Sequence, residues 1–484
     1  MSVLSHLQPV NVLRYFEELA AIPHGSGNTK AISDYCVAFA KARGLQVRQD
    51  EANNVIIIKE ASAGYENVPA VILQGHLDMV CEKDPGCPMD MKKDSLRLQT
   101  DSQWIWAEGT TLGGDDGIAI AMTLAILDND SLPHPRLEAV FTSDEETGMT
   151  GAKALDPSML RSRLLLSMDA DKEGVLTVAC AGGIRANCRL PLTREPASGV
   201  LCHLEIKGLI GGHSGMAIHL GRANANVLMG RLLYALCQEL PLQLVALTGG
   251  MADNAIAANA VCTVLLPQEE AARAVALTED WSEVFRKEYQ TADPGLTVSF
   301  ETGDLCEVQA VTAAATARTA AALMAMPSGV QVMNADIPGL VQTSLNLGML
   351  RMEDNVLTCT FGVRSSLASE KAMLCSRISC IASLAGGKTE YAGDYPAWEY
   401  QKDSAFRELV IDAYRKQTGK EPVIQIVHAG LECGIFSDKL PGVECVTVGP
   451  NLLDTHTPRE RMEVASVART YALVLELLRR ANEL

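Results

Sequence analysis

Five residues that could bind metal ions are spread along this chain, each after an apolar run that resembles a buried strand or in a glycine-rich or polar loop. They are His76, Asp115, Glu146, Asp169 and His456. Two further acids, Asp78 and Glu145, lie close to them in sequence. Metal ligands, a carboxylate that can orient one of them and a free base together form the set that a metal-dependent hydrolase needs to activate water.

The first candidate ends an apolar run, Val71-Ile-Leu-Gln-Gly-His76-Leu-Asp78. Side chains two positions apart on a strand share a face, so Asp78 can reach the ring of His76. A partner of this kind fixes the tautomer of a metal-bound histidine. Taken alone, the pattern also fits an ordinary polar strand end.

The second candidate lies in a glycine-rich loop, Gly109-Thr-Thr-Leu-Gly-Gly-Asp115-Asp116-Gly117, which opens an apolar helix. A phosphate-binding loop is one alternative, but the lysine of that motif is missing and two acids stand where an anion would bind. A helix N-cap formed by Asp115 or Asp116 is the other alternative.

The other candidates also lie at strand ends or in a loop. Three adjacent acids, Asp144-Glu145-Glu146, follow the apolar run Leu137–Thr142, and such a cluster repels itself unless cations compensate. Asp169 ends the run Leu164–Met168, and His456 lies in the polar loop Asp454-Thr-His-Thr-Pro.

The elements that must position these residues predict an α/β fold. Strands are expected at Val55–Ile58, Val68–Leu73, Leu137–Thr142 and Leu164–Met168, and helices at 10–21 and Gly117–Leu127. Their alternation predicts a doubly wound, mostly parallel sheet with helices on both faces. Ligands gather at the carboxyl ends of such strands, where all five candidates are expected.

Charge counting supports two metal ions at this edge. Two divalent ions would carry four positive charges against three negative charges from Asp115, Glu146 and Asp169, which leaves one for a bridging hydroxide. Oxygen and nitrogen ligands without thiolate suit zinc first, and also cobalt or manganese.

The chain changes character from about Gly183. Strand-like segments such as Leu201–Ile206 and Val356–Gly362 surround helical stretches at Asn224–Glu239 and Val311–Met326. This part spans about twice the length of a small α/β unit, which would fit an internal duplication, although no sequence repeat is visible.

From about Asp394 the doubly wound pattern returns, with a helix at Asp403–Thr418, strands at Val423–Val427 and Val443–Val448, and a helix at Val464–Ala481. We therefore expect a catalytic domain formed by residues 1–185 and 394–484, interrupted by an inserted α+β lid domain at 186–393.

Composition limits the partners. With 484 residues, 48% of them hydrophobic, the chain can build two or three cores. Its net charge of −18 and the lack of basic stretches argue against nucleic acid and membrane surfaces as partners. No apolar run approaches the ~20 residues of a membrane span. Fourteen scattered cysteines without C-x-x-C spacing indicate a reduced, cytoplasmic protein without a signal peptide.

The sequence resembles the M20 metallopeptidases, in particular the aminoacyl-histidine dipeptidases, over most of its length. The resemblance rests on Gly75-His-Leu-Asp-Met-Val, Gly109-Thr-Thr-Leu-Gly-Gly-Asp-Asp-Gly, Asp144-Glu-Glu-Thr-Gly, Gly211-Gly-His-Ser-Gly and His428-Ala-Gly-Leu-Glu-Cys-Gly. The chain reads Gly-Gly-Asp-Asp where the family usually has Gly-Ala-Asp-Asn, which keeps the ligand and changes its neighbour.

The resemblance implies a zinc-peptidase-like catalytic domain in which Asp115 bridges two metal ions. His76 and Asp169 would complete the coordination of one ion, and Glu146 and His456 would complete that of the other. The peptide bond after the bridging aspartate is often cis in this family. Glu145 would act as general base and then as general acid.

The inserted domain would supply substrate contacts. His213 resembles the lid histidine that stabilises the oxyanion, with His219 as a nearby competitor, and Arg364 resembles the residue that pairs with the substrate carboxylate. Asn254 could contact the substrate backbone, and Glu432 could hold a free amino group. Dimerisation in this family usually runs through the lid, so we expect a homodimer.

These expectations describe a cytoplasmic dinuclear-zinc dipeptidase for unblocked dipeptides, with Xaa-His substrates, including beta-alanyl-histidine, foremost. A tripeptidase or an N-acyl amino acid deacylase on the same metal centre is the alternative enzyme. A metal-binding scaffold without turnover is the alternative from another class, and the presence of Glu145 argues against it.

Overall fold

The structure, a computed structural model, describes residues 3–335, 337 and 339–484. It divides into two compact units. The first unit consists of Met1–Cys180, Trp398–Ile426 and Leu431–Leu484, and the second of Ala181–Ala397 and Val427–Gly430. Each unit has its own hydrophobic core.

The first unit is built on a twisted α/β sheet with strand order β1-β2-β6-β3-β7-β21-β8-β20. Its centre is parallel, as expected, and pairs β6 with β3, β3 with β7 and β7 with β21, whereas the pairs β1–β2, β2–β6 and β21–β8 are antiparallel. The bounds are β1 Gln46–Gln49, β2 Val55–Lys59, β3 Val71–His76, β6 Leu137–Thr142, β7 Leu164–Ser167, β8 Val175–Cys180, β20 Val423–Val427 and β21 Glu444–Thr447. The α/β fold class is therefore confirmed, with a mixed sheet.

Helices cover both faces of this sheet. Successive side chains of a strand point to opposite faces, and in β3 all of them are buried, so both faces need a cover. Leu73 packs in the core with helices α1, α3 and α11, whereas Gln74 donates a hydrogen bond to Glu432 at the start of α10. A Cβ at Gly75 would lie 2.8 Å from that of Ala119, so only glycine lets α3 approach β3 this closely. The helices are α1 Val10–Ala20, α2 Lys30–Ala42, α3 Gly114–Leu127, α4 Thr150–Ala154, α9 Ala405–Thr418, α10 Glu432–Lys439 and α11 Val464–Arg480.

The expected strand Val68–Leu73 lies about three residues later in the structure, as β3. Val68 lies in a bend, Pro69 and Ala70 have no regular structure, and the strand continues through Gly75 to His76. His76 is the last residue of this fully buried strand, and Asp78 lies beyond its end.

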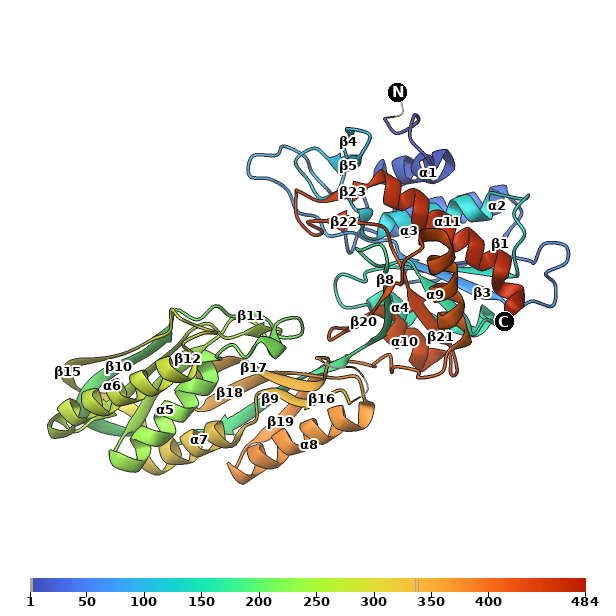
Figure 1. The fold of residues 1–484 in the computed structure, drawn as a ribbon. Helices are drawn as coiled ribbons and strands as arrows, with labels where there is room; N and C mark the ends of the chain where they lie inside the picture. Colours follow the sequence, from blue (N-terminus) through green and yellow to red (C-terminus); the bar gives the residue numbers. More distant parts are fainter. Residues whose placement is uncertain (1–2, 336, 338) are drawn as a thin grey trace. The chain divides into compact units, whose positions relative to one another are not determined.

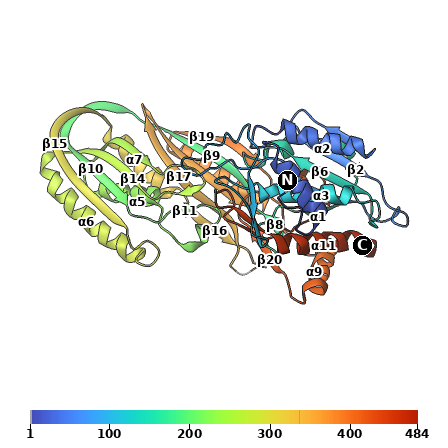
Figure 2. The same cartoon turned by 90° about the horizontal axis from the view of Figure 1, so that it is seen from above.

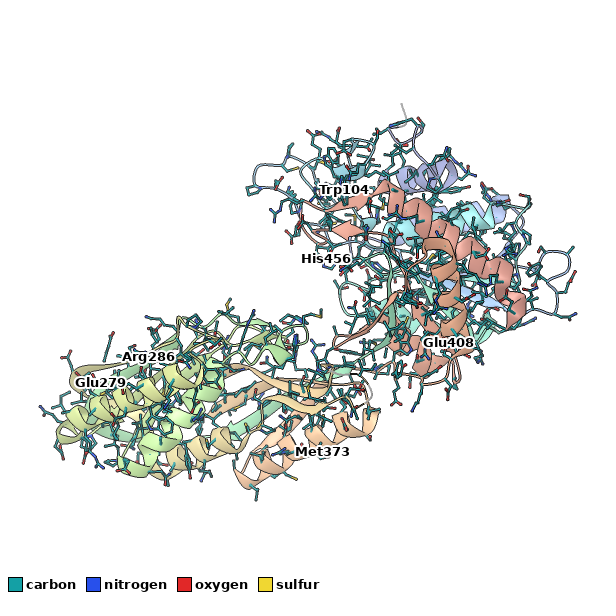
Figure 3. All side chains as sticks on the ribbon, in the orientation of Figure 1. Trp104, Glu279, Arg286, Met373, Glu408 and His456 are labelled. Carbon is teal, nitrogen blue, oxygen red and sulfur yellow. The ribbon has the colours of Figure 1, made fainter. Side chains whose placement is uncertain are left out.

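A small sheet with order β22-β23-β5-β4 lies in the same unit. It pairs β23, Arg461–Glu463, with β5, Trp104–Ala107; β4 is Leu98–Thr100 and β22 is Leu452–Leu453. His456 lies in the loop between β22 and β23, and Figure 3 labels it together with Trp104 on β5. This pairing ties the C-terminal loop that carries His456 to the N-terminal part of the unit.

The second unit consists of two modules with the same topology. In the first module, β10-α5-β12-β14-α6-β15, the strands lie in the order β15-β10-β14-β12; in the second, β9-α7-β17-β18-α8-β19, they lie in the order β19-β9-β18-β17. Both are the βαββαβ arrangement of ferredoxin-like folds. The bounds are β9 Gly182–Pro191, β10 Arg194–Lys207, α5 Ala225–Glu239, β12 Gln243–Gly249, β14 Ala260–Leu266, α6 Ala271–Glu288, β15 Thr297–Val311, α7 Ala313–Ala325, β17 Val341–Glu353, β18 Val356–Ser365, α8 Ala368–Leu384 and β19 Lys388–Tyr395.

The first module is inserted into the second, between β9 and α7. The two modules join where β12 pairs with β17, the second strand of each, so that one continuous sheet results. Apolar residues of α5, α6, α7 and α8 form one core against this sheet. Figure 1 shows the four helices beside its strands, and Figure 2 shows α5, α6 and α7 from above. The topology thus has the form of an internal duplication, which the length of this part suggested although no sequence repeat is visible.

Among the described residues, no helix is both long and apolar enough to cross a membrane. All fourteen cysteines are free thiols.

Candidate active site

Asp115 stands between two histidines in the first unit. Its Oδ1 lies 3.1 Å from Nε2 of His76, and its Oδ2 lies 3.2 Å from Nε2 of His456. The second imidazole also lies 2.8 Å from Oε1 of Glu146. Each oxygen of one carboxylate therefore faces a different imidazole, which is the arrangement of a group that bridges two cations.

The hydrogen bonding of His76 fixes what its second nitrogen can do. Nδ1 lies 2.9 Å from the backbone oxygen of Asp78. A carbonyl only accepts, so Nδ1 carries the hydrogen and Nε2 presents a lone pair toward Asp115. Two acceptors face each other there unless Nε2 is protonated as well, so the pair offers a place for a proton or for a metal ion.

The electrostatics of these groups agree. Burial lowers the pKa of His76, but hydrogen bonds to Asp115 and Asp78 raise it well above its ordinary value. Contacts with Asp115 and Glu146 raise the pKa of His456 to about 10. The cluster therefore attracts positive charge, and its oxygen and nitrogen donors fit divalent metal ions.

Three sets of donor atoms lie within 4.8 Å of one another: His76 with Asp116 and Asp169, His76 with Glu145 and Glu146, and Asp115 with Glu146 and His456. The structure thus brings together all five metal-ligand candidates and the base candidate. Burial, followed by the charge of Asp115, raises the pKa of Asp169 to about 7.

The loop before α3 positions Asp115 without a side-chain cap. The N-cap is Gly113, in the left-handed region at φ 67°, and neither Asp115 nor Asp116 has helical dihedral angles. The peptide bond between these two acids is cis, as the family resemblance implies. Asp116 accepts the backbone N–H of His76 through Oδ2, at 3.1 Å, so it fastens β3 to the loop.

Glu460 holds the glycine-rich loop, a role that the sequence did not suggest. Its carboxylate accepts hydrogen bonds from the backbone N–H groups of Leu112, Gly113, Gly114 and Asp115, at 2.8 to 3.4 Å. It is 2% exposed. Glu460 lies in a polar run far from this loop in sequence, and no local pattern distinguishes it from a surface glutamate.

Asp78 holds the acidic turn that carries Glu145 and Glu146. Its carboxylate accepts the backbone N–H of Glu145 at 2.9 Å, that of Glu146 at 3.3 Å and the hydroxyl of Ser26 at 2.8 Å. Its Oδ1 lies 3.5 Å from Nδ1 of His76. Asp78 thus orients His76 chiefly through its backbone oxygen, and its side chain orients the base and one ligand.

Glu432 lies buried behind this cluster, at the start of α10. Its Oε2 accepts hydrogen bonds from Gln74 and from Thr142, both at 2.6 Å. Its Oε1 has no hydrogen-bond partner among the described residues. Burial, together with nearby acids, raises its pKa to about 8.

In the second unit, the hydrogen bonds of His213 select one tautomer. Nδ1 accepts the backbone N–H groups of Gly215 and Met216, at 3.2 and 3.1 Å, so Nε2 carries the hydrogen and is the donor. Asn254 lies beside it, because its backbone oxygen accepts from the N–H of Ser214 at 2.7 Å and β11, Gly212–His213, pairs with β13, Ala255–Ile256.

A cluster of basic side chains surrounds this turn. Arg364 on β18 donates from Nη1 to the hydroxyl of Tyr395 at 2.9 Å, while its Nε is buried without a hydrogen-bond partner among the described residues. His428 bonds through Nε2 to Oγ of Ser344 at 2.7 Å. Burial, and then the charges of Arg364, His213 and His219, lower the pKa of His428 to about 4. The sequence did not single out His428 or Ser344 as site residues.

Comparisons with known proteins agree with this geometry. The cytosol non-specific dipeptidase of Escherichia coli K12 is 37% identical over 99% of each chain. The crystal structure of the aminoacylhistidine dipeptidase from Vibrio alginolyticus superposes with a TM-score of 0.92 at 37% identity, covering 98% of this chain and 97% of that one.

A tripeptidase from Staphylococcus aureus shares the fold at a TM-score of 0.56 and 17% identity, covering 99% of this chain and all of that one. The model of peptidase family M20/M25/M40 matches residues 72–480. This chain belongs to peptidase family M20/M25/M40.

Proposed function

We propose that this chain is a dinuclear-metal dipeptidase that hydrolyses the peptide bond of unblocked dipeptides. The observation that carries the proposal is the Asp115 carboxylate, whose two oxygens face the Nε2 atoms of His76 and His456. A carboxylate shared in this way would hold two metal ions, and the buried acid beside it, Glu145, could act as a base toward a water in the site.

In this proposal five residues would hold two divalent ions: Asp115 would be shared by both, His76 and Asp169 would bind one, and Glu146 and His456 would bind the other. Zinc is our first choice, with cobalt or manganese as alternatives. The bound ions would lower the pKa of a coordinated water and polarise the scissile carbonyl.

Glu145 would take a proton from the attacking water and deliver it to the leaving amine. Asp78 keeps Glu145 in place through the backbone N–H that it accepts. Asp78 also holds Nδ1 of His76 protonated through its backbone oxygen, so that Nε2 faces the metal site.

Residues of the second unit bind the substrate. His213 donates from Nε2 to the oxyanion of the tetrahedral intermediate, in accord with its Nδ1 acting as acceptor. Arg364 pairs with the free carboxylate of the dipeptide. Asn254 contacts the peptide backbone, and Glu432 of the first unit offers Oε1 to the free amino group.

The names of the relatives support a dipeptide substrate, since both are dipeptidases. We infer that Xaa-His peptides, including beta-alanyl-histidine, are among the substrates. We further propose that residues 1–185 and 394–484 act as the catalytic domain, that 186–393 act as a lid and dimerisation domain, and that the enzyme is a cytoplasmic homodimer.

Hydrolysis of a small peptide panel tests the proposal. The purified protein is stripped with EDTA and assayed with and without added zinc on beta-alanyl-histidine, Gly-His, Ala-Leu, N-acetyl-Ala-Leu and Gly-Gly-Leu. We expect zinc-dependent cleavage confined to the three free dipeptides, with a preference for histidine in the second position.

Cleavage of the tripeptide alone would make the chain a tripeptidase, and cleavage of the acetylated peptide alone would make it an N-acyl amino acid deacylase. Zinc binding without any turnover would favour a metal-binding scaffold. Each of these outcomes contradicts the dipeptidase proposal.

A further inference from the structure

A row of four residues crosses the sheet of the second unit. Ser344 on β17 pairs with Arg364 on β18. Arg364 in turn pairs with Gly183 on β9, and Gly183 pairs with Tyr395 on β19. Directly paired residues share a face of the sheet. Val363, the chain neighbour of Arg364, packs in the core with the helices, so this row lies on the opposite face.

Gly183 allows Tyr395 to reach Arg364 across the strand between them. Their strands are two spacings apart, ~9–10 Å. Nη1 of Arg364 nevertheless donates a hydrogen bond to the hydroxyl of Tyr395 at 2.9 Å, so the phenol ring lies over Gly183. A Cβ at Gly183 would meet the hydroxyl oxygen and would lie 2.8 Å from Cε1 of the ring. The hydrogen bond therefore depends on a glycine at this position.

The backbone of Tyr395 is held from α8. Nζ of Lys371 donates to the backbone oxygen of Tyr395 at 2.9 Å and forms an ion pair with Asp394, the preceding residue of β19. The end of β19 is thereby tied to the helix that follows β18. This contact gives the phenol ring a fixed starting point from which it reaches Arg364.

Tyr395 is a neutral partner, so it orients the guanidinium of Arg364 without cancelling the charge. Arg364 forms no ion pair with any residue that the structure describes. Arg185, also on β9, shows the alternative arrangement, because its Nε donates to the carboxylate of Asp253 at 2.6 Å. An arginine paired in that way has little charge left for a ligand, whereas Arg364 keeps its full charge.

The second edge of the Arg364 guanidinium lacks an acceptor. Nε is buried, and neither Nε nor Nη2 has a hydrogen-bond partner in the described part of the chain. These two nitrogens form the fork that matches the two oxygens of a carboxylate. Burial and then the charge of Arg364 lower the pKa values of His213 and His428, so a positive potential extends around this group.

We propose that Tyr395 is a positioning residue for substrate binding: it holds one edge of the Arg364 guanidinium so that the other edge meets the carboxylate of the dipeptide. The inference rests on the proposed function, which takes Arg364 as the partner of that carboxylate. A free arginine side chain loses rotamer freedom when it binds a ligand. A side chain that is already ordered loses less and binds more tightly.

The variant Tyr395→Phe tests the role of the hydroxyl, because it keeps the ring and removes the acceptor. Zinc-loaded wild type and variant are assayed with Gly-His and with Gly-His amide, which lacks the carboxylate. We expect KM for Gly-His to rise ~5–20-fold and kcat to change less than about two-fold, since the bound substrate and the transition state share this contact. The constants for the amide should stay near those of the wild type. An unchanged KM for Gly-His would overturn the inference.

A double-mutant cycle shows whether the hydroxyl acts through Arg364. In an Arg364→Met background, Tyr395→Phe should change KM for Gly-His by less than about two-fold, because no guanidinium remains to be held. Equal effects in both backgrounds would overturn the inference. The matched control is Tyr391→Phe on the same strand, whose hydroxyl donates to the backbone oxygen of Cys375 on α8 at 2.6 Å. It should leave the constants for both substrates unchanged.

The variant Gly183→Ala tests the same contact from the other side. Its Cβ would displace the phenol ring, so we expect KM for Gly-His to rise as in Tyr395→Phe, again without an effect on the amide. A folded Gly183→Ala protein with wild-type KM would contradict the inference. If this variant fails to fold, Tyr395→Phe and the double-mutant cycle decide without it.

The wild-type measurements separate the inference from the function on which it rests. Zinc-loaded wild type that hydrolyses no dipeptide would overturn the proposed function, and the inference with it. Wild type that hydrolyses Gly-His and its amide equally well would remove the carboxylate contact of Arg364 and the role of Tyr395 together. A preference for Gly-His that survives in Tyr395→Phe would overturn the inference alone.

Discussion

The two units carry clusters of opposite charge. In the first unit, acids surround two histidines and raise their pKa values. In the second unit, burial and then the charges of Arg364 and two neighbouring histidines lower the pKa of His428 to about 4. The first cluster is suited to cations and the second to anions, as expected if one holds metal ions and the other holds the charged end of a substrate.

The two clusters are also assembled differently. Three of the metal-ligand candidates, His76, Glu146 and Asp169, end or follow the parallel strands β3, β6 and β7, so the fold class brings them to one edge. Asp115 lies at the start of α3, and His456 lies in a loop of the small antiparallel sheet. The basic cluster depends on pairing between β17 and β18 and on a hydrogen bond between Ser344 and His428. The ends of strands can be recognised in a sequence, whereas the pairing register between neighbouring strands cannot.

The largest expected effect on the acidic cluster comes from replacing Glu145. We expect Glu145→Ala to lower kcat by at least ~1,000-fold with metal content unchanged, because general acid–base catalysis contributes ~10²–10⁴-fold. Steady-state kinetics and metal analysis on the same sample measure both quantities. Glu51→Ala, which removes an exposed carboxylate, is the control. Turnover near the wild-type rate would remove Glu145 from its role as the base.

Metal stoichiometry distinguishes a bridging ligand from a terminal one. Asp115→Ala should lose most of both ions, since its two oxygens face the two sites, whereas His456→Ala should retain about one ion per chain. Mass spectrometric metal analysis after dialysis counts them, with the exposed His203→Ala as control. Equal losses in the two variants would contradict a bridging Asp115.

Arg364 tests the basic cluster with a smaller expected effect. Arg364→Met should lower kcat/KM for Gly-His by ~30–100-fold and that for Gly-His amide by only a few-fold, because a charge-assisted pair with the carboxylate is worth roughly 2–3 kcal/mol. The exposed Arg189→Met on β9 is the matched control. A similar loss for acid and amide would show that Arg364 does not bind the carboxylate.

Much of the fold and of the metal site could be predicted from sequence because the signals are local. His76 and Glu146 follow apolar runs, and the glycines before Asp115 mark a loop that needs unusual backbone conformations. Glu460 could not be predicted, since it joins the loop across 345 residues of sequence at Asp115. The length of the inserted part suggested a duplication, but no sequence repeat supported it, because two modules can share a topology without sharing sequence.

A variant of Glu460 tests whether this contact between residues far apart in sequence contributes to stability and to metal affinity. Glu460→Gln replaces one acceptor oxygen by a donor that faces backbone N–H groups, so it should destabilise the first unit by roughly 2–3 kcal/mol. It should also weaken metal affinity, because the loop carries Asp115. Thermal unfolding and metal titration measure the two effects, and the exposed Glu408→Gln, labelled in Figure 3, is the control. Unchanged stability and affinity would show that the loop holds its shape without this carboxylate.

Replacing His428 should have the smallest effect, and it should appear only in how the free energy of unfolding depends on pH. Burial and the charges of Arg364, His213 and His219 lower its pKa from an ordinary 6.5 to about 4. The folded protein therefore keeps the ring neutral while the unfolded chain takes up a proton below pH 6.5. This contribution to stability is complete above that pH and is lost as the pH falls toward 4.

Between pH 7 and pH 5, the wild type should therefore lose roughly 1–2 kcal/mol more stability than His428→Gln, which cannot take up that proton. Comparing the two proteins removes the contribution of acids that both contain, and the exposed His203→Gln should behave as the wild type does. Denaturant unfolding of the second unit at the two pH values measures the difference. Parallel losses in wild type and His428→Gln would mean that the ring is not held neutral, and hence that the basic cluster does not exert the positive potential that an anionic substrate group would meet.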